Sequence, residues 1–245
     1  MSHITIEVSE SARQIVPNLR VFGVVVRDLD GLRNADITVV LEAATKSLAE
    51  AGFDPELLAQ SEPFRSWRNV FAAMGLQPSR FRSSVEALVR RTLKTGMVPV
   101  TGIKAVDLYN AGSVWHQVPM GAYDLDRVSG PIMIRTAQPT DAFVPLGGAP
   151  EDFPLKETVV VYAQDSQVLC FGVNHRDNLE TAITQETNDA VFFAESLADV
   201  DPLAAPRALE WLASLLFQMG GSRGAVFAVP VNGEPVPTTS WDEMV

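Results

Sequence analysis

The order of strand-like segments in the second half of the chain is the feature that most limits its fold. After Gly130 the runs IMIRTA, AFVPLGG, TVVVYA and QVLCFGV follow one another through short turns, and the last two are separated by residues 164–166. Parallel neighbours would need a long crossover connection, usually a helix, between each pair of strands. The sequence therefore predicts an α+β fold with a largely antiparallel sheet flanked by helices.

The remaining segments combine strand and helix patterns. ITIEV, RVFGVVVRDL and AVFAVPV have strand patterns, and helical periodicity indicates helices at 36–50, 63–74, 81–96 and 206–221. Residues 178–197 fit either a helix or a strand. We expect an N-terminal extension packed on the core (1–60), a main domain (61–230) and a loose C-terminal tail (231–245).

The distribution of charge suggests one surface for nucleic acid. The 245-residue chain has a net charge of −11, which argues against a general nucleic-acid binder. Between Ser61 and Lys104, however, eight arginines and lysines face only two acidic residues. A helix at 81–96 would place Arg82, Glu86, Arg90 and Lys94 on one outward stripe. This band either contacts RNA through Arg82, Arg90, Arg91 and Lys94, or is an ordinary solvated helix face.

Other classes of protein find little support in the composition. The single cysteine, Cys170, lies in the apolar run VLCFG, so we expect a core residue and no intrachain disulfide. No apolar run is long enough to span a membrane, and MSHITIEVSE does not resemble a signal peptide, so we expect a cytoplasmic protein. The sequence predicts no metal site and no cofactor, because phosphate-binding and zinc-binding motifs are missing.

One stretch, Val98 to Asp126, places polar residues at intervals that fit neither a plain helix nor a plain strand. Acidic, amide, tyrosine and histidine side chains are punctuated there by glycines and prolines, which break regular structure. The stretch therefore predicts a binding or catalytic site, with Asn110 and Asp124 as candidate catalytic residues because an amide and a carboxylate can orient substrate and water. Both side chains also have possible structural roles, Asn110 as a helix cap and Asp124 in a turn.

The same stretch resembles a known family. VDLYN (106–110) and PMGAYDL (119–125) are similar to paired motifs of the B3/4 domain, the tRNA-binding and editing region of the phenylalanyl-tRNA synthetase β-subunit. The resemblance continues through SGPIMIRTAQPTDAFVPLGG and covers roughly residues 60 to 200. No synthetase catalytic module is present, so the chain looks like a freestanding version of that domain.

The resemblance implies a pocket, but some of the family's pocket residues are replaced in this sequence. In the family the pocket removes a wrongly attached tyrosine by hydrolysing its ester bond to the tRNA. The family's threonine, histidine and glycine positions fall on Tyr109, Gly121 and Gly172, and its glutamate falls on Glu195 or, in another alignment, on Phe193. We add Tyr123 and Asn174 as substrate-binding candidates. Because two pocket groups are changed, we expect an amino acid other than tyrosine.

Three functions remain open from sequence. The first is hydrolysis of a mischarged aminoacyl-tRNA in trans, with tRNA or its aminoacylated 3′ end as partner, since a held water and backbone amides suffice for an activated ester. The second is a non-catalytic module that binds an amino acid or related small metabolite. The third is a protein-interaction fragment that uses the basic helix.

Overall fold

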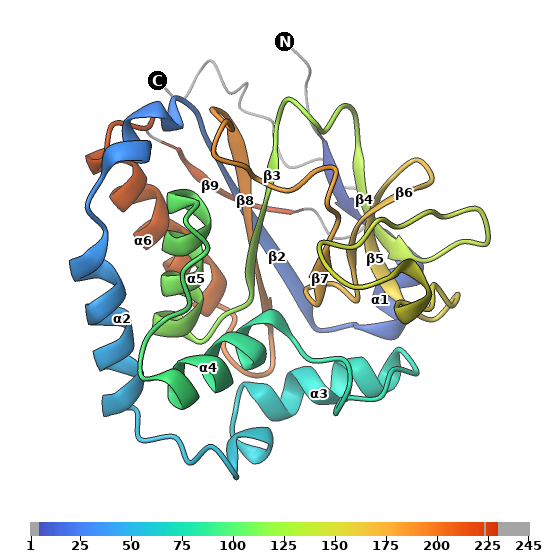
Figure 1. Cartoon of the computed structure of the whole chain (residues 1–245). Coiled ribbons are helices and arrows are strands. Elements are labelled where there is room, and N and C mark those ends of the chain that lie inside the picture. Colours follow the sequence, from blue (N-terminus) through green and yellow to red (C-terminus); the bar gives the residue numbers. More distant parts are fainter. Residues whose placement is uncertain (1–4, 223, 230–245) are drawn as a thin grey trace.

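The computed structural model describes residues 5–222 and 224–229, and these residues form two sheets with helices packed around them (Figure 1). The five-stranded sheet has the order β1 (Ile6–Val8), β4 (Ile132–Thr136), β5 (Val160–Gln164), β6 (Gln167–Phe171) and β7 (Arg176–Asp177). The four-stranded sheet has the order β3 (Met120–Asp124), β8 (Ala190–Leu197), β2 (Leu19–Val26) and β9 (Val226–Ala228). Among the described strand pairs, β1 with β4 is parallel and the others are antiparallel. The predicted α+β fold with largely antiparallel sheets is confirmed.

Most helices lie where periodicity predicted them. The α-helices are α1 (Glu10–Ile15), α2 (Thr38–Glu50), α3 (Phe64–Ala73), α4 (Ser84–Thr95), α5 (Lys104–His116) and α6 (Ala204–Gln218). Three short 3₁₀ turns add Leu29–Asn34, Leu58–Gln60 and Pro150–Asp152. The described residues include no helix that is long and apolar enough to cross a membrane.

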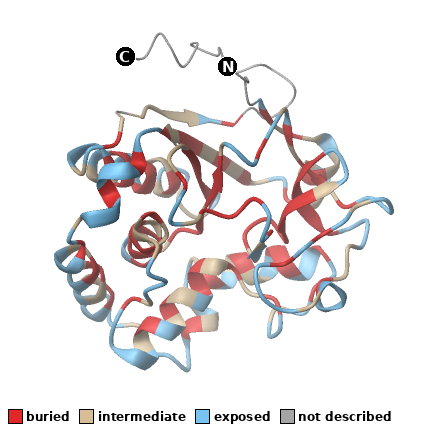
Figure 2. Ribbon diagram, turned by 45° about the horizontal axis from the view of Figure 1, so that its top comes forward, coloured by how far each residue is buried: buried red, intermediate tan, exposed pale blue. Residues whose placement is uncertain are grey.

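The helices and sheets form layers that bury the strands. Helices α5 and α6 pack beside the four-stranded sheet, α2 packs outside α5, and α3 and α4 lie along the lower end in Figure 1. Buried residues follow the strands and the inner faces of the helices (Figure 2). Gly112 allows α5 to approach α6, because a Cβ atom there would lie 2.7 Å from the ring of Trp211.

One segment differs from its predicted form, and the structure adds detail to two others. The polar stretch at 98–126 was predicted to be irregular, but it contains helix α5 and strand β3. The ambiguous segment 178–197 contains β8, which pairs with both β2 and β3. The N-terminal residues contribute β1 to one sheet and β2 to the interior of the other. The tail predicted at 231–245 lies outside the described residues.

Candidate functional site

A small cavity lies between the two sheets, next to the turn that follows β6. Its volume is about 40 Å³, enough for about three water molecules, since each needs roughly 10–15 Å³. Of the residues predicted from sequence, it brings together Gly121, Tyr123, Asn174 and Glu195. Its other polar lining residues are Ser84, Tyr162, Cys170, His175, Arg176 and Asp177.

Glu195 is the central acid of this cavity. It lies on β8 with only 4% of its surface exposed, and Tyr162 Oη donates a hydrogen bond of 2.5 Å to Oε1. Its Oε2 has no hydrogen-bond partner among the described residues. Burial, aided by the charge of Asp177, raises the pKa of Glu195 to about 8 despite the Tyr162 hydrogen bond. At neutral pH the carboxyl is therefore mostly protonated, and Oε2 is free to carry the proton.

Asp177 is a second acid, contributed by the edge strand β7. A Cβ atom built on Gly121 would lie 3.9 Å from Oδ1 of Asp177, so the missing side chain leaves room beside this carboxylate. Desolvation raises the pKa of Asp177 to about 6, while the Cys170 thiol and the charge of Arg176 partly oppose the rise. Asp177 is thus mostly ionised at neutral pH, next to a protonated Glu195. Environments that separate the pKa values of two neighbouring acids are typical of catalytic sites.

The turn between β6 and β7 positions Asn174. Gly172 and Val173 have φ angles of 68° and 66°, a left-handed conformation that is strained for a β-branched residue and that clusters at functional sites. The Asn174 carbonyl accepts a hydrogen bond of 2.8 Å from the Ser84 amide. Both polar atoms of the Asn174 side chain are buried and lack a well-formed hydrogen bond to any described residue. The Asn174 amide lies close enough to Glu195 to oppose the rise of its pKa, and the rest of its hydrogen-bonding capacity is open to a ligand or water.

His175 holds the same turn against the start of α4. Because a carbonyl oxygen can only accept, the 2.6 Å contact between Nδ1 and the Arg82 carbonyl requires that Nδ1 carries the proton. Burial among phenylalanine rings lowers the pKa of His175, so the ring is neutral. This arrangement supports a positioning role.

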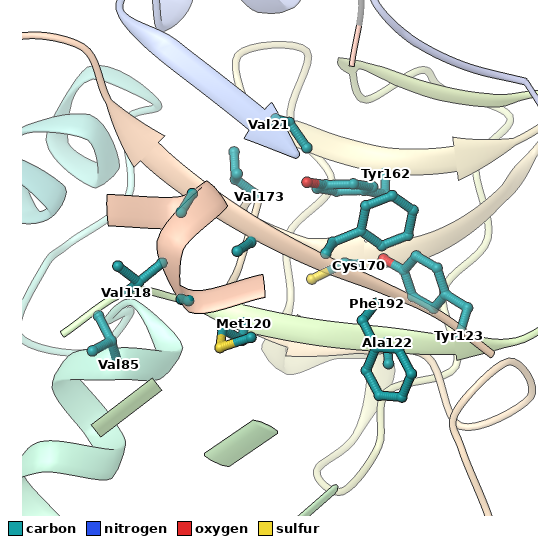
Figure 3. Close-up of a cluster of buried hydrophobic side chains, with 14 of the residues drawn as sticks. Val21, Val85, Val118, Met120, Ala122, Tyr123, Tyr162, Cys170, Val173 and Phe192 are labelled. Atoms are coloured by element: carbon teal, nitrogen blue, oxygen red, sulfur yellow. The ribbon is translucent and has the colours of Figure 1, made fainter. Parts of the chain in front are cut away.

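Tyrosine and cysteine side chains complete the cavity wall. Tyr123, Tyr162 and Cys170 lie together between the strands (Figure 3). Burial is the largest cause that raises the pKa of each of these three groups well above its ordinary value. Burial likewise raises the pKa of Tyr109, which packs edge-on against Phe192 beside this cavity. Cys170 is therefore a protonated thiol and not a nucleophile.

The two candidate catalytic residues from the polar stretch do not line this cavity. Asp124 accepts hydrogen bonds from Thr187 Oγ1 at 2.6 Å and from the Asp126 amide at 3.0 Å, and its Oδ2 lies 3.5 Å from Arg127 Nε. Asn110 is buried on α5. Gly172 is not among the residues that line the cavity, and a Cβ atom there would lie 3.2 Å from the Phe71 ring.

The basic helix α4 is built around a buried carboxylate. Glu86 was predicted on the outward stripe, but its side chain has 0% exposure. Arg68 donates to both of its oxygens at 2.9 and 2.6 Å, Arg90 Nε donates at 2.8 Å, and Arg82 Nε lies 3.8 Å away. Ser83 Oγ accepts from the Glu86 amide at 3.4 Å, so half of a capping box forms, while the Glu86 carboxylate binds arginines instead.

The other two predicted RNA-binding residues are not held by a carboxylate of the described residues and are free to contact phosphates. Arg91 and Lys94 are exposed on α4 and make no ion pair with any residue between 5 and 222 or between 224 and 229. The start of α4 reaches the cavity through Ser84. Arg91 and Lys94 lie toward the other end of the same helix.

Sequence reasoning missed several lining residues. Tyr162 and Asp177 come from the five-stranded sheet, far in sequence from the polar stretch. The segment VNHRDN directly after a strand gave a usable signal, because it gathers Asn174, His175 and Asp177 in one turn. In the described part of the chain, no three His, Cys, Asp or Glu residues are grouped as metal ligands.

The chain matches one known protein family. The family model for the B3/4 domain matches residues 66–221. The chain belongs to the B3/4 domain family. Several lining residues of the cavity, from Ser84 to Glu195, fall within the matched segment of this B3/4 domain.

One solved structure is similar to this B3/4 domain protein. It is the crystal structure of an N-terminal fragment of the phenylalanyl-tRNA synthetase β-subunit from Pyrococcus horikoshii, with 15% sequence identity and a TM-score of 0.44. The match covers 94% of this chain and 52% of that one, so this chain spans about half the length of that fragment. No curated protein matches this chain.

Proposed function

We propose that this B3/4 domain is an editing-type domain that binds the aminoacylated 3′ end of a tRNA and hydrolyses a mischarged ester in trans. The observation that carries the proposal is the pair Glu195 and Asn174, which line one cavity and interact there only weakly, so that Oε2 of Glu195 and the Asn174 amide make no hydrogen bond of good geometry to a described residue. Buried polar groups are normally satisfied, so unsatisfied ones in a cavity favour a ligand or ordered water. Membership of the B3/4 family supports a link to tRNA.

Hydrolysis of an aminoacyl ester needs only a few protein side chains. A water molecule adds to the ester carbonyl carbon, and the bond from that carbon to the ribose oxygen then breaks. The products are a free amino acid and a tRNA with a terminal hydroxyl, and the proton lost by the water passes through solvent to the ribose oxygen. Glu195, protonated on Oε2, donates a hydrogen bond to the oxygen on which negative charge develops, and the Asn174 amide orients the water.

The basic surface gives this site a route to RNA. Arg91 and Lys94 lie on α4, Arg82 lies just before it, and the first residue of α4, Ser84, lines the cavity. Phosphates of the acceptor end would contact α4 while the aminoacyl group enters between the sheets. Arg90 contributes less, because its guanidinium is held by Glu86 and the Pro55 carbonyl.

We expect the double variant Arg91→Glu/Lys94→Glu to bind tRNA more weakly than the unchanged protein. Each lost phosphate contact lowers the slope of log affinity against log salt by about one, so the pair lowers it by about two. Filter binding or fluorescence anisotropy at several salt concentrations measures the slope. The control is Arg33→Glu/Lys46→Glu, which reverses two ion-paired surface cations outside the basic band. Equal slopes in both double variants would show that α4 does not contact the RNA.

A second function, non-catalytic binding of a small amino acid or related metabolite, is favoured by one observation. The cavity volume of about 40 Å³ is far below the roughly 300 Å³ of common small-molecule sites. A cavity of this size suits a small polar group rather than a complete aminoacyl-adenosine. In the hydrolytic proposal the adenosine therefore remains outside the cavity.

A panel of mischarged tRNAs separates the two functions. We expect at least one aminoacyl-tRNA to lose its amino acid at ten or more times the spontaneous rate, since one positioned acid contributes about 10²-fold. Release of labelled amino acid measures this rate. If every ester decays at its spontaneous rate while the free amino acid binds, the binding function replaces the hydrolytic one.

A further inference from the structure

The cavity lining has more acidic side chains than cationic side chains that could pair with them. Asp177 makes no ion pair with any described residue, and Glu195 lies on the facing strand. The one cationic side chain in the lining, Arg176, is exposed, and it donates from Nη1 to the Leu146 carbonyl at 3.1 Å while its guanidinium stacks over Phe153. His175 donates Nδ1–H to a backbone carbonyl. The charge of Arg176 lowers the pKa of Asp177 but does not bring it back to its ordinary value, and Arg176 forms no ion pair with this carboxylate.

The neighbours of Asp177 leave its carboxylate open on one side. Cys170 lies beside it, and Gly121 on β3 faces it without a side chain. A Cβ atom on Gly121 would have the two Asp177 carboxylate oxygens as its nearest neighbours, and the same cavity is lined by Tyr162 and Asn174. Asp177 is partly buried, and a carboxylate in such a position is stabilised when a positive group joins it.

We propose that Asp177 is a specificity-determining residue that binds the α-ammonium group of the aminoacyl moiety in the space left by Gly121. This inference rests on the proposed function, because it names the part of the substrate that enters the cavity. An ammonium group is close to water in size, so a cavity of about 40 Å³ accommodates it with a small side chain. The substrate class is thus an aminoacyl ester with a free amino group and a small side chain, and an N-acylated ester is rejected.

The first arm of the experiment measures hydrolysis. Unchanged protein, Asp177→Asn and the exposed control Asp126→Asn are assayed with an aminoacyl-tRNA from the panel and with its N-acetylated form. We expect unchanged protein and Asp126→Asn to prefer the free-amine substrate at least tenfold in kcat/KM. Asp177→Asn loses this preference, because its KM for the free-amine substrate rises to that for the acetylated form. Equal preference in all three proteins overturns the inference.

The second arm separates this inference from the hydrolytic proposal. Alanine amide and N-acetylalanine amide are titrated into the same three proteins by calorimetry, which requires no catalysis. Preferential binding of alanine amide that Asp177→Asn abolishes supports ammonium recognition even if no tRNA is deacylated. No preference for alanine amide in unchanged protein overturns the inference, whatever the deacylation assay shows. Circular dichroism melting checks that Asp177→Asn is folded, which we expect because it only removes a desolvated charge.

Discussion

Replacement of Glu86 with alanine is expected to lower the free energy of unfolding by about 3 kcal/mol. The carboxylate is fully buried and compensates Arg68 and Arg90, with Arg82 close by. Its removal leaves partly buried guanidinium groups without their counter-charge, and breaking a buried ion pair from one side typically costs about 3–5 kcal/mol. The lower end applies because the three arginines keep contact with solvent. Urea unfolding at neutral pH measures the change.

Glu62→Ala is the matched control for this prediction. Glu62 also binds an arginine, Arg65, at 2.6 Å, but both side chains are largely exposed. Exposed ion pairs contribute about 0–1 kcal/mol, so the control should be nearly neutral. Similar losses in both variants would show that Glu86 is not the centre of this cluster.

The second large effect is a fall in stability with rising pH that depends on Glu195. Its pKa is about 8 in the folded protein and near the ordinary 4.5 when unfolded. Between these values the unfolded chain loses a proton that the folded chain keeps, so the free energy of unfolding decreases as pH rises. The difference corresponds to at most about 5 kcal/mol by pH 8. Asp177 also makes the free energy of unfolding decrease as pH rises, but only between pH 3.8 and about pH 6.

Glu195→Gln should remove the part of this fall that lies above pH 6. The amide cannot ionise, so the free energy of unfolding of the variant should not fall between pH 6 and 8, and it should exceed that of the unchanged protein at pH 8. Urea unfolding at pH 5, 6, 7 and 8 gives both curves. A flat curve for the unchanged protein would mean that Glu195 ionises without difficulty in the folded state.

Periodicity predicted the amphipathic elements and failed where burial is uniform. Helix α4 presents one apolar face, and its boundaries follow from Ser83 and Gly96. Strand β8 is buried along all eight residues, so it lacks the alternation that identifies a half-exposed strand. Helix α5 is buried on several sides, and its polar Asp107 faces the preceding loop, where it accepts from the Thr101 and Gly102 amides at 2.6 and 3.2 Å.

The candidate site was predictable only in part, for geometric reasons. On β3, side chains alternate between faces, so Gly121 and Tyr123 line the cavity while Asp124 points to the other side and binds Thr187. On β8, Phe193 and Glu195 share one face, so either alignment of the family's glutamate leads to this cavity. The contact of Tyr162 with Glu195 joins two sheets, and no local sequence pattern encodes such a pairing.

The most direct test of the central claim is the pH dependence of kcat/KM for deacylation of the best substrate in the panel. We expect a bell-shaped profile for the unchanged protein, which rises near pH 6 as Asp177 ionises and falls near pH 8 as Glu195 loses its proton. In Glu195→Gln the rate should be about 100-fold lower and the fall near pH 8 should be absent. A rate that rises steadily with pH and is the same in both proteins would contradict the assignment of this cavity as the editing site.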